Sequence, residues 1–420
     1  MADNKDKKVL NVPHLRFPEF SGEWEKCKVS DLLDFYSTNS LSWEQLEYDT
    51  NVMMNLHYGL IHVGLPTMVD LAKDKLPNIK EDNMPKNFEL CKEGDVAFAD
   101  ASEDTNEVAK AIEFYNLAGK NIVCGLHTIH GRDNKHKTVV GFKGYAFSST
   151  AFHNQIRRIA QGTKIYSIST KNFSECYIGL PSKPEQTKIA TLLRLIDERI
   201  ATQNKIIEKY ESLIQAMCDT LIGKKTQQVM LSFNDFGESY SGLSGKSAED
   251  FGEGSPYITY MNVYQNQIID ITDIGLVKIN KTEQQSLVQY GDILFTLSSE
   301  TPEEVGMGAV YLGETYPLYL NSFCFGIHIT DESKIFPPFL AYYVSSESFR
   351  KAVFPLAQGS TRFNLQKGDF LKKVFPFPAI EQQRKIYSIL KTYSDKLNIE
   401  KQMIKLLCCQ KQYLLRQLFI

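Results

Sequence analysis

The sequence repeats itself at a constant offset of 197 residues. Three pairs of segments match without a gap: GDVAF at 94–98 with GDILF at 291–295, AQG at 160–162 with AQG at 357–359, and PSKPEQTKI at 181–189 with PAIEQQRKI at 378–386. A duplicated unit of nearly half the chain is far too long for a solenoid repeat. It predicts one globular domain followed by one long helix, made twice. We therefore expect two related surfaces and a bipartite target.

Composition is that of an ordinary water-soluble protein. The chain has 420 residues, of which 43% are hydrophobic and 23% charged, so it is long enough for two or more domains with separate cores. No apolar run approaches the length of a membrane span, and the N-terminal residues lack the apolar core of a signal peptide. We expect a cytoplasmic protein without membrane contact.

Turns and apolar runs divide the chain into five segments. These are an N-terminal segment at 1–23, a mixed domain at 24–181, a helix at 182–223, a second mixed domain at 224–378 and a second helix at 379–420. Strands are predicted at 96–98, 122–124, 138–142, 292–297 and 322–327, and shorter helices at 106–117 and 339–349. The predicted fold class is mixed α/β, with two similar domains in a pseudo-twofold repeat.

Both long helix segments carry a heptad stripe of apolar residues. The first begins with a predicted capping box, Ser182-x-x-Glu185, and ends before Gly223. One polar residue interrupts the stripe at the same register in each helix, Gln203 in the first and Glu400 in the second. The stripe comprises Ile189, Leu193, Ile196, Ile200, Gln203, Ile207 and Tyr210 in the first helix, and Ile386, Leu390, Leu397, Glu400, Ile404, Leu407 and Leu414 in the second. Such a seam needs a partner helix. We predict that the two helices pair as an antiparallel coiled coil; two separate core helices are the alternative.

Basic residues gather in the first domain although the net charge is −3. Between Thr128 and Lys164 seven basic residues face one acid, Asp133. This local excess is sufficient to hold a phosphate backbone. An ordinary solvated basic face is the alternative. The equivalent stretch of the second half, 328–362, is only weakly basic.

Polar loops supply the candidate contacts to nucleic acid. Gln and Arg can make paired hydrogen bonds to adenine and guanine edges, and Ser, Thr and Lys can hold phosphates. Ordinary turns joining domain to helix are the alternative for any one of them. The candidate residues are Ser37, Thr38, Asn39, Arg132, Lys135, Lys137, Arg157, Arg158, Gln161, Thr163, Lys164, Ser241, Ser244, Lys246, Ser298, Ser299, Gln358, Ser360, Thr361 and Arg362.

Several motifs suggest catalysis, but each lacks an essential residue. The loop GLSGKS at 242–247 has Tyr240 where a phosphate-binding P-loop needs glycine. The segment FPPF at 336–339 has Phe336 where an amino-methyltransferase needs Asn or Asp. Asp95 and Asp292 are interpreted as turn formers. The eight cysteines have no C-x-x-C spacing, and the histidines, among them His127, His130 and His153, lack helical His/Glu spacing. We therefore predict reduced thiols, no metal site and no catalytic residue.

The remaining motifs are the opening PHLRFPEF at 13–20 with Glu23-Trp24, the duplicated Gly-Asp strand and helix starts, Leu195-Ile196-Asp197, and YLLRQLF at 413–419. In this order they resemble the specificity subunits of type I restriction-modification systems, over essentially the whole chain. The second helix departs from the first, with Ala379 in place of the Ser cap and Lys411 on the seam.

The resemblance implies a non-catalytic subunit that binds double-stranded DNA. Two target-recognition domains would each read one half of a split sequence, and the helices would set the spacing. Two modification subunits would carry S-adenosylmethionine, and a restriction subunit would use ATP and Mg, so no cofactor is expected in this chain. The alternative is a scaffold with two ligand-binding domains that does not act on DNA.

Overall fold

The computed structural model describes residues 11–50, 52–223, 228–280 and 282–420. The chain folds into two units, the first made of Met1–Asn204 with Gln402–Ile420 and the second of Lys205–Lys401. Each unit holds one globular domain and part of both long helices, whereas the sequence suggested the helices as separate segments. Residues 1–10 of the predicted N-terminal segment and 224–227 at the start of the predicted second domain lie outside the described residues.

The first unit is built on a five-stranded sheet of order β2-β11-β7-β9-β5, joined by a four-stranded sheet of order β10-β4-β6-β3. Its strands are β1 (Glu25–Lys28), β2 (Asp34–Tyr36), β3 (Leu46–Glu47), β4 (Met54–Leu56), β5 (Met68–Asp70), β6 (Asn78–Ile79), β7 (Val96–Ala99), β8 (Ala101–Ser102), β9 (Ala111–Asn116), β10 (Ile122–Cys124), β11 (Thr128–Arg132), β12 (Tyr166–Ser167) and β13 (Tyr177–Leu180). Its short helices are α1 (Val29–Leu32), α2 (Tyr58–His62), α3 (Lys143–Phe147), α4 (Thr150–Ile159) and α5 (Thr170–Ser174). The long helix α6 (Lys183–Ile222) begins in this unit.

The second unit repeats the plan with a four-stranded sheet of order β15-β22-β18-β20 and a smaller sheet of order β17-β16-β21. Its strands are β14 (Gln228–Leu231), β15 (Gly237–Ser241), β16 (Phe251–Ile258), β17 (Ile274–Val277), β18 (Ile293–Thr296), β19 (Ser298–Ser299), β20 (Gly308–Val310), β21 (Tyr319–Leu320), β22 (Cys324–Ile329), β23 (Ala357–Gln358), β24 (Phe363–Leu365) and β25 (Phe375–Pro378). Its helices are α7 (Tyr260–Gln265), α8 (Pro337–Tyr343), α9 (Glu347–Val353), α10 (Lys367–Lys372) and the start of α11 (Ile380–Gln417).

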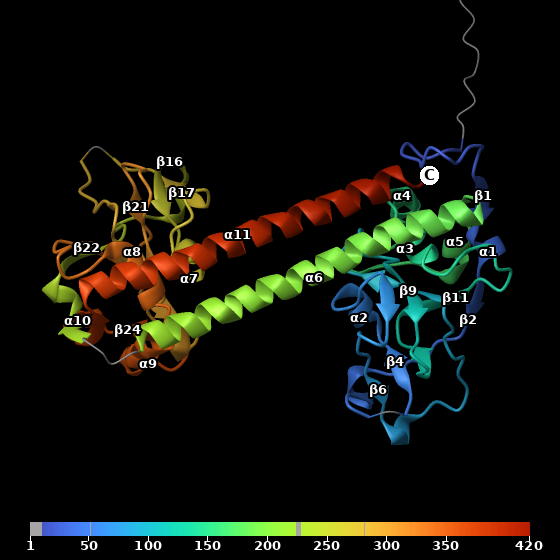
Figure 1. Ribbon diagram of the computed structural model, residues 1–420, viewed down its shortest axis with the longest axis horizontal. Helices are drawn as coiled ribbons and strands as arrows, with labels where there is room; N and C mark the ends of the chain where they lie inside the picture. Colours follow the sequence, from blue (N-terminus) through green and yellow to red (C-terminus); the bar gives the residue numbers. More distant parts are fainter. Residues whose placement is uncertain (1–10, 51, 224–227, 281) are drawn as a thin grey trace, which may run out of the picture. The chain divides into compact units, whose positions relative to one another are not determined.

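Within each unit, α6 and α11 lie side by side in opposite directions (Figure 1). In the first unit Asp197 forms a 2.6 Å ion pair with Lys411, and in the second Glu211 forms a 2.6 Å ion pair with Lys401. The earlier residue of α6, Asp197, pairs with the later residue of α11, Lys411, as an antiparallel arrangement requires. Lys411, which departs from the apolar seam, is accommodated because Asp197 neutralises it.

The residues of the predicted seam are buried or half-buried along both helices. In the first unit Ile189, Leu193 and Ile196 share a core with Leu414 and residues that follow it. In the second unit the corresponding core contains the end of α6 and the start of α11. The 3.5-residue period therefore marks the side of each helix that is removed from water.

One glutamine fixes the start of each long helix to its domain. Gln186 Oε1 accepts from the backbone N–H of Val139, and Gln186 Nε2 donates to the carbonyls of Lys137 and Pro181. At the equivalent position in α11, Gln383 makes the same three bonds to the backbone of Phe336, Lys334 and Pro378. Both glutamines are fully buried. The repeated Gln-x-Lys-Ile motif thus encodes this attachment.

The opening motif anchors the start of α6. Arg16 donates through Nε and Nη2 to the Glu185 carboxylate at 2.7 and 2.8 Å, and Trp24 Nε1 lies 3.2 Å from the same group. The prediction of a capping box was therefore wrong, because Glu185 bonds to Arg16 and Trp24 instead of returning to Ser182.

Three other local predictions were wrong. Residues 106–117 form a turn and the strand β9, not a helix. This strand lies between β7 and β5, and its first four residues are buried whichever face they occupy, Glu113 included, so no alternation of polar and apolar residues marks it. Residues 138–142 form no strand, because they turn into α3. The helix predicted at 339–349 is two helices, because Ser346 caps α9 by accepting from Phe349 N–H. Among the described residues, none of the helices combines the length and apolar character that a membrane crossing needs.

Candidate nucleic-acid interface

A short exposed hairpin occurs at the same place in both units. In the first, Gln161 and Ser167 exchange two backbone hydrogen bonds of 2.8 and 2.9 Å. In the second, Gln358 is paired with Asn364 across β23 and β24. The glycines that follow Gln161 and Gln358 have φ of +138° and +139°. A Cβ atom at either glycine would collide with the backbone carbonyl three residues later. The AQG repeat therefore encodes one hairpin conformation.

The hairpin lies at a defined end of the main sheet in each unit. In the first unit, β12 of the hairpin pairs with β8, which follows β7, and Ser37 follows β2 at the same end of the sheet. In the second unit, β24 pairs with β19 after β18, and Ser241 ends β15 at that same end. Strand register thus brings the polar loops and the hairpin together in both copies.

The two copies differ in charge around the hairpin. Arg157 and Arg158, in the last turn of α4, and Lys164 in the hairpin are exposed. The 197-residue offset places Phe354, Pro355 and Thr361 at these positions in the second unit. There Arg362 supplies the exposed cation, and its guanidinium lies 5.8 Å from the ring centroid of Phe323.

A buried ion pair lies at the opposite end of the main sheet in the first unit, before β7 and at the end of β11. Asp95 is 1% exposed; its Oδ2 is 2.8 Å from His130 Nε2, and Arg132 donates to both carboxylate oxygens at 2.8 and 2.9 Å. Arg132 also donates to Glu89 and to the carbonyl of Leu90. Burial alone would raise the pKa of Asp95, but bonds from His130 and Arg132 lower it below 3.8. Asp95 is thus more than a turn former.

The second unit keeps the carboxylate and changes its partners. Asp292 is equally buried, and it accepts from the Tyr240 hydroxyl at 2.7 Å and lies 2.9 Å from His328 Nδ1. Burial and the carboxylate raise the pKa of Tyr240 well above 10.0, so its hydroxyl remains a donor. Both aspartates also accept a backbone N–H three residues earlier, from Lys92 and Gln289, as expected for a turn former.

The structure buries the side chains of four of the predicted contact residues and places two others away from the hairpin. Arg132 is buried and its donors are used by Asp95, Glu89 and Leu90. The Lys246 side chain is 3% exposed and pairs with Glu283. Ser298 and Ser299 are buried in β19. Lys135 and Lys137 remain accessible but follow the end of β11 opposite the hairpin, where Lys135 donates to the carbonyl of Asp31 and Lys137 to the Glu25 carboxylate. The four buried side chains hold the fold together, and contact of the two lysines with nucleic acid stays a prediction.

The other candidates lie at the hairpin end of the sheets. Asn39 is half-buried and its amide donates to Asn55 and to the carbonyl of Cys124. The rest are exposed: Ser37, Thr38, Arg157, Arg158, Gln161, Thr163, Lys164, Ser241, Ser244, Gln358, Ser360, Thr361 and Arg362. Their contact with nucleic acid stays a prediction.

Comparison with known protein families identifies the repeated domain. The family described as "Type I restriction modification DNA specificity domain" matches residues 74–212 and again residues 230–407. The chain belongs to this family. The first match begins inside the first globular domain and the second spans the second domain, and both continue into the long helix that follows. The family model thus matches once in each half of the internal repeat.

Specificity subunits of type I restriction enzymes are among the relatives of this specificity-domain protein. The MjaVIII subunit of Methanocaldococcus jannaschii is 26% identical over 266 residues, which cover 57% of this chain and 60% of the relative. The EcoKI subunit of Escherichia coli is 25% identical over 269 residues, covering 59% of this chain and 56% of the relative. The chain thus spans about three-fifths of the length of the curated relatives it matches.

The fold of the specificity-domain protein is also found in a solved structure. The type I S subunit from M. genitalium aligns over 97% of this chain and 99% of that chain, with a TM-score of 0.53 and 18% sequence identity. At this identity the likeness concerns the fold alone. It supports two mixed α/β domains separated by long helices.

Sequence reasoning missed two features of this specificity-domain protein. Phe323, 54% exposed beside Arg362, lies at the hairpin end because its carbonyl accepts from Leu297 N–H. An exposed aromatic residue next to a cation suits stacking on a base. The fold also gathers Cys91, Cys124 and His130, although they are far apart in sequence.

Removing the charge of Asp95 should destabilise the first unit in a pH-dependent way. An Asp95→Asn variant removes the buried carboxylate that pairs with Arg132 and leaves this side chain only the more exposed Glu89 as an acidic partner; breaking a buried pair costs about 3–5 kcal/mol. Because the folded-state pKa of Asp95 is below 3.8, this contribution is complete above that pH and is lost as the pH falls through the lowered pKa. Urea unfolding at neutral and acidic pH measures it. A Glu103→Gln control on the surface should change little, and a deficit that persists at low pH would contradict the argument.

Proposed function

We propose that this chain is the specificity subunit of a type I restriction-modification complex and binds double-stranded DNA. Each domain would read one half of a bipartite target with the hairpin end of its sheet. The observation that carries the proposal is the exposed hairpin, made twice with the same glycine conformation. Family membership and the names of the relatives support it.

The chemistry of the hairpins suits base and phosphate recognition. Gln161 in one unit and Gln358 with Arg362 in the other can make paired hydrogen bonds to base edges in the major groove. Lys164, Arg157 and Arg158 can neutralise phosphates. Because the first unit has more exposed cations here, its half-site should contribute more of the salt dependence of binding.

The paired helices would set the distance between the half-sites and dock two modification subunits. Those subunits would carry the S-adenosylmethionine chemistry, and a restriction subunit would supply ATP- and Mg-dependent cleavage. This chain would contribute sequence choice without catalytic residues or a cofactor in the reaction. Because its DNA substrate would be the chromosome and incoming DNA, the complex would work in the cytoplasm.

Altering one hairpin should change recognition of one half-site only. Gln358→Ala or Arg362→Ala removes a base-edge contact and should cost about 1–3 kcal/mol of discrimination at one position. The fold should persist, because both side chains are exposed and Gly359 sets the hairpin. Mapping methylated bases made by the chain with its modification subunits measures the change.

The matched controls are Gln161→Ala and Lys164→Ala in the other hairpin. They should affect the other half-site and leave the first intact. An equal loss at both half-sites for either pair would contradict modular reading. Binding to duplex DNA that does not weaken as salt rises would instead favour a scaffold that does not act on DNA.

A further inference from the structure

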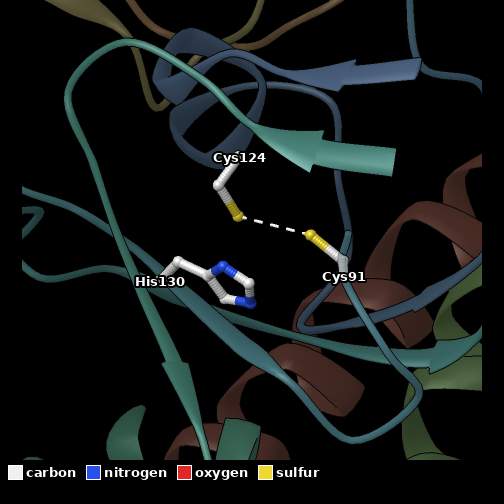
Figure 2. Close-up of side chains that lie close together, drawn as sticks. All are labelled: Cys91, Cys124 and His130. Atoms are coloured by element: carbon white, nitrogen blue, oxygen red, sulfur yellow. Dashed lines mark hydrogen bonds between the residues drawn. The ribbon is translucent and has the colours of Figure 1, made fainter. Parts of the chain in front are cut away.

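Three side chains of metal-ligand type meet in the first unit, where its two sheets join. Cys91 precedes β7, Cys124 ends β10 in the smaller sheet, and His130 lies in β11 of the larger sheet. One ligand atom of each lies within 4.8 Å of the others, and the two sulfur atoms are 3.6 Å apart. Figure 2 shows the imidazole beside both sulfurs. In tetrahedral Zn²⁺ sites, with Zn–S near 2.3 Å, two sulfurs lie about 3.8 Å apart.

The imidazole is already oriented as a ligand. His130 is fully buried, and its Nε2 is 2.8 Å from the Asp95 carboxylate, which leaves Nδ1 as the nitrogen for a metal. Within the described part of the chain, Nδ1 has no hydrogen-bond partner. A buried polar atom without a partner is costly. Metal-binding histidines commonly donate their other ring N–H to a carboxylate, as this ring can to Asp95.

The second unit lacks all three ligands at once. Strand pairing makes Val288, Leu320 and Gly326 the equivalents of Cys91, Cys124 and His130; for the last two, this is one residue short of the 197-residue offset. Cys91 matches Val288 because each donates its backbone N–H to an equivalent carbonyl. The acceptor of Cys91 lies two residues before Cys124, and the acceptor of Val288 lies two residues before Leu320. Cys124 and Leu320 end the strands that pair in parallel with β4 and β16. His130 and Gly326 hold the same register opposite β7 and β18. The ligand-type residues therefore occur as a set.

We propose that the first unit binds one Zn²⁺ through Cys91 Sγ, Cys124 Sγ and His130 Nδ1, with water as a fourth ligand. Each thiol gives its proton to solvent as it coordinates, so two thiolates balance the charge of the ion. Asp95 is balanced separately by Arg132. The buried site is then neutral overall, which avoids the cost of an uncompensated charge.

The metal would tie the two sheets of the first unit together. Cys124 contributes a further link, because its carbonyl accepts from the backbone N–H of Asn39 at 3.0 Å. Asn39 belongs to the polar loop that starts at Ser37. A metal bond to Cys124 would therefore fix the base of this loop. The role is structural, and it does not depend on the proposed DNA binding.

Metal content of the full chain tests the proposal. The background variant is Cys408→Ser with Cys409→Ser, because these two exposed thiols could bind metal adventitiously. After incubation with Zn²⁺ and dialysis, elemental analysis should find one zinc per chain. Co²⁺ in its place should give the thiolate charge-transfer band and the visible bands of tetrahedral coordination. Zn²⁺ should also raise the melting temperature.

The decisive variant replaces Cys91 and Cys124 by the residues of the second unit, Cys91→Val with Cys124→Leu. The fold should tolerate them, and retained zinc, the cobalt bands and the thermal shift should all fall to background. Cys324→Ala, which removes a buried thiol from the second unit, should keep all three. Equal zinc in the double variant, no zinc in the background protein, or a Cys91–Cys124 disulfide in the protein as purified would overturn the proposal.

Discussion

A Phe419→Ala substitution is expected to destabilise the first unit by about 3–5 kcal/mol and leave the second unit nearly unchanged. Phe419 lies just beyond α11, a helix that begins in the second unit, but it packs in the core of the first. There its ring meets Trp24 edge-on at 6.4 Å between centroids. Hydrogen exchange of peptides from each unit measures where protection is lost.

The matched control is Ile222→Ala, at the position 197 residues earlier. Ile222 ends α6, which begins in the first unit, and it is buried in the core of the second. This change should cost about 2–5 kcal/mol in the second unit instead. If Phe419→Ala loosened the second unit, or if both variants loosened the same unit, the assignment of helix ends to cores would be wrong.

If the chain binds a bipartite DNA target as proposed, lengthening both long helices by one heptad is expected to lengthen the spacer between the two half-sites. Seven residues add about 10.5 Å to a helix, which corresponds to about three base pairs of B-DNA. The insertions belong after Asn204 in α6 and after Lys405 in α11, because the 197–411 and 211–401 ion pairs place these positions opposite each other. A whole heptad keeps the seam in phase.

Methylome mapping with the modification subunits gives the new spacer directly. An insertion into α6 alone is the control, and it should impair folding or assembly because its seam no longer matches that of α11. A spacer that stays unchanged in the double insertion would refute the role of the helices in spacing. This outcome would leave sequence reading by the domains untouched.

The duplicated plan and the helix seams could be predicted because they rest on long, regular patterns. A stripe such as Ile189, Leu193 and Ile196 repeats over many turns, and the same register recurs 197 residues later. The strand β9 could not be predicted in this way, because it is short and buried on both faces. Its Glu113 is fully buried and accepts from the N–H groups of Gly141 and Gly144. Whether such a segment forms a strand depends on its pairing with other strands of the sheet, here β5 and β7.

The exposure of a candidate contact residue could be predicted from the sequence only where its near neighbours in the sequence determine that exposure. The two polar loops are marked by the repeated AQG, whose glycine has the same conformation in both copies; that they are hairpins comes from the structure. The role of Arg132 depends on Asp95, 37 residues earlier, and a count of basic residues cannot reveal that partner. The same holds for Cys91, Cys124 and His130, which only strand register brings together. Long-range contacts therefore separate structural cations and thiols from those available to a ligand.

The glutamine attachments at the helix starts bear on how such proteins diverge. Gln186 and Gln383 bond only to backbone N–H and carbonyl groups of their domains. Every residue except proline offers the same backbone groups, so a domain can change nearly all its side chains without weakening this joint. Recombination between related genes at the repeated helix starts could then exchange a whole domain in one step. If the domains read DNA as proposed, such an exchange would give a new specificity without any change at the helix starts.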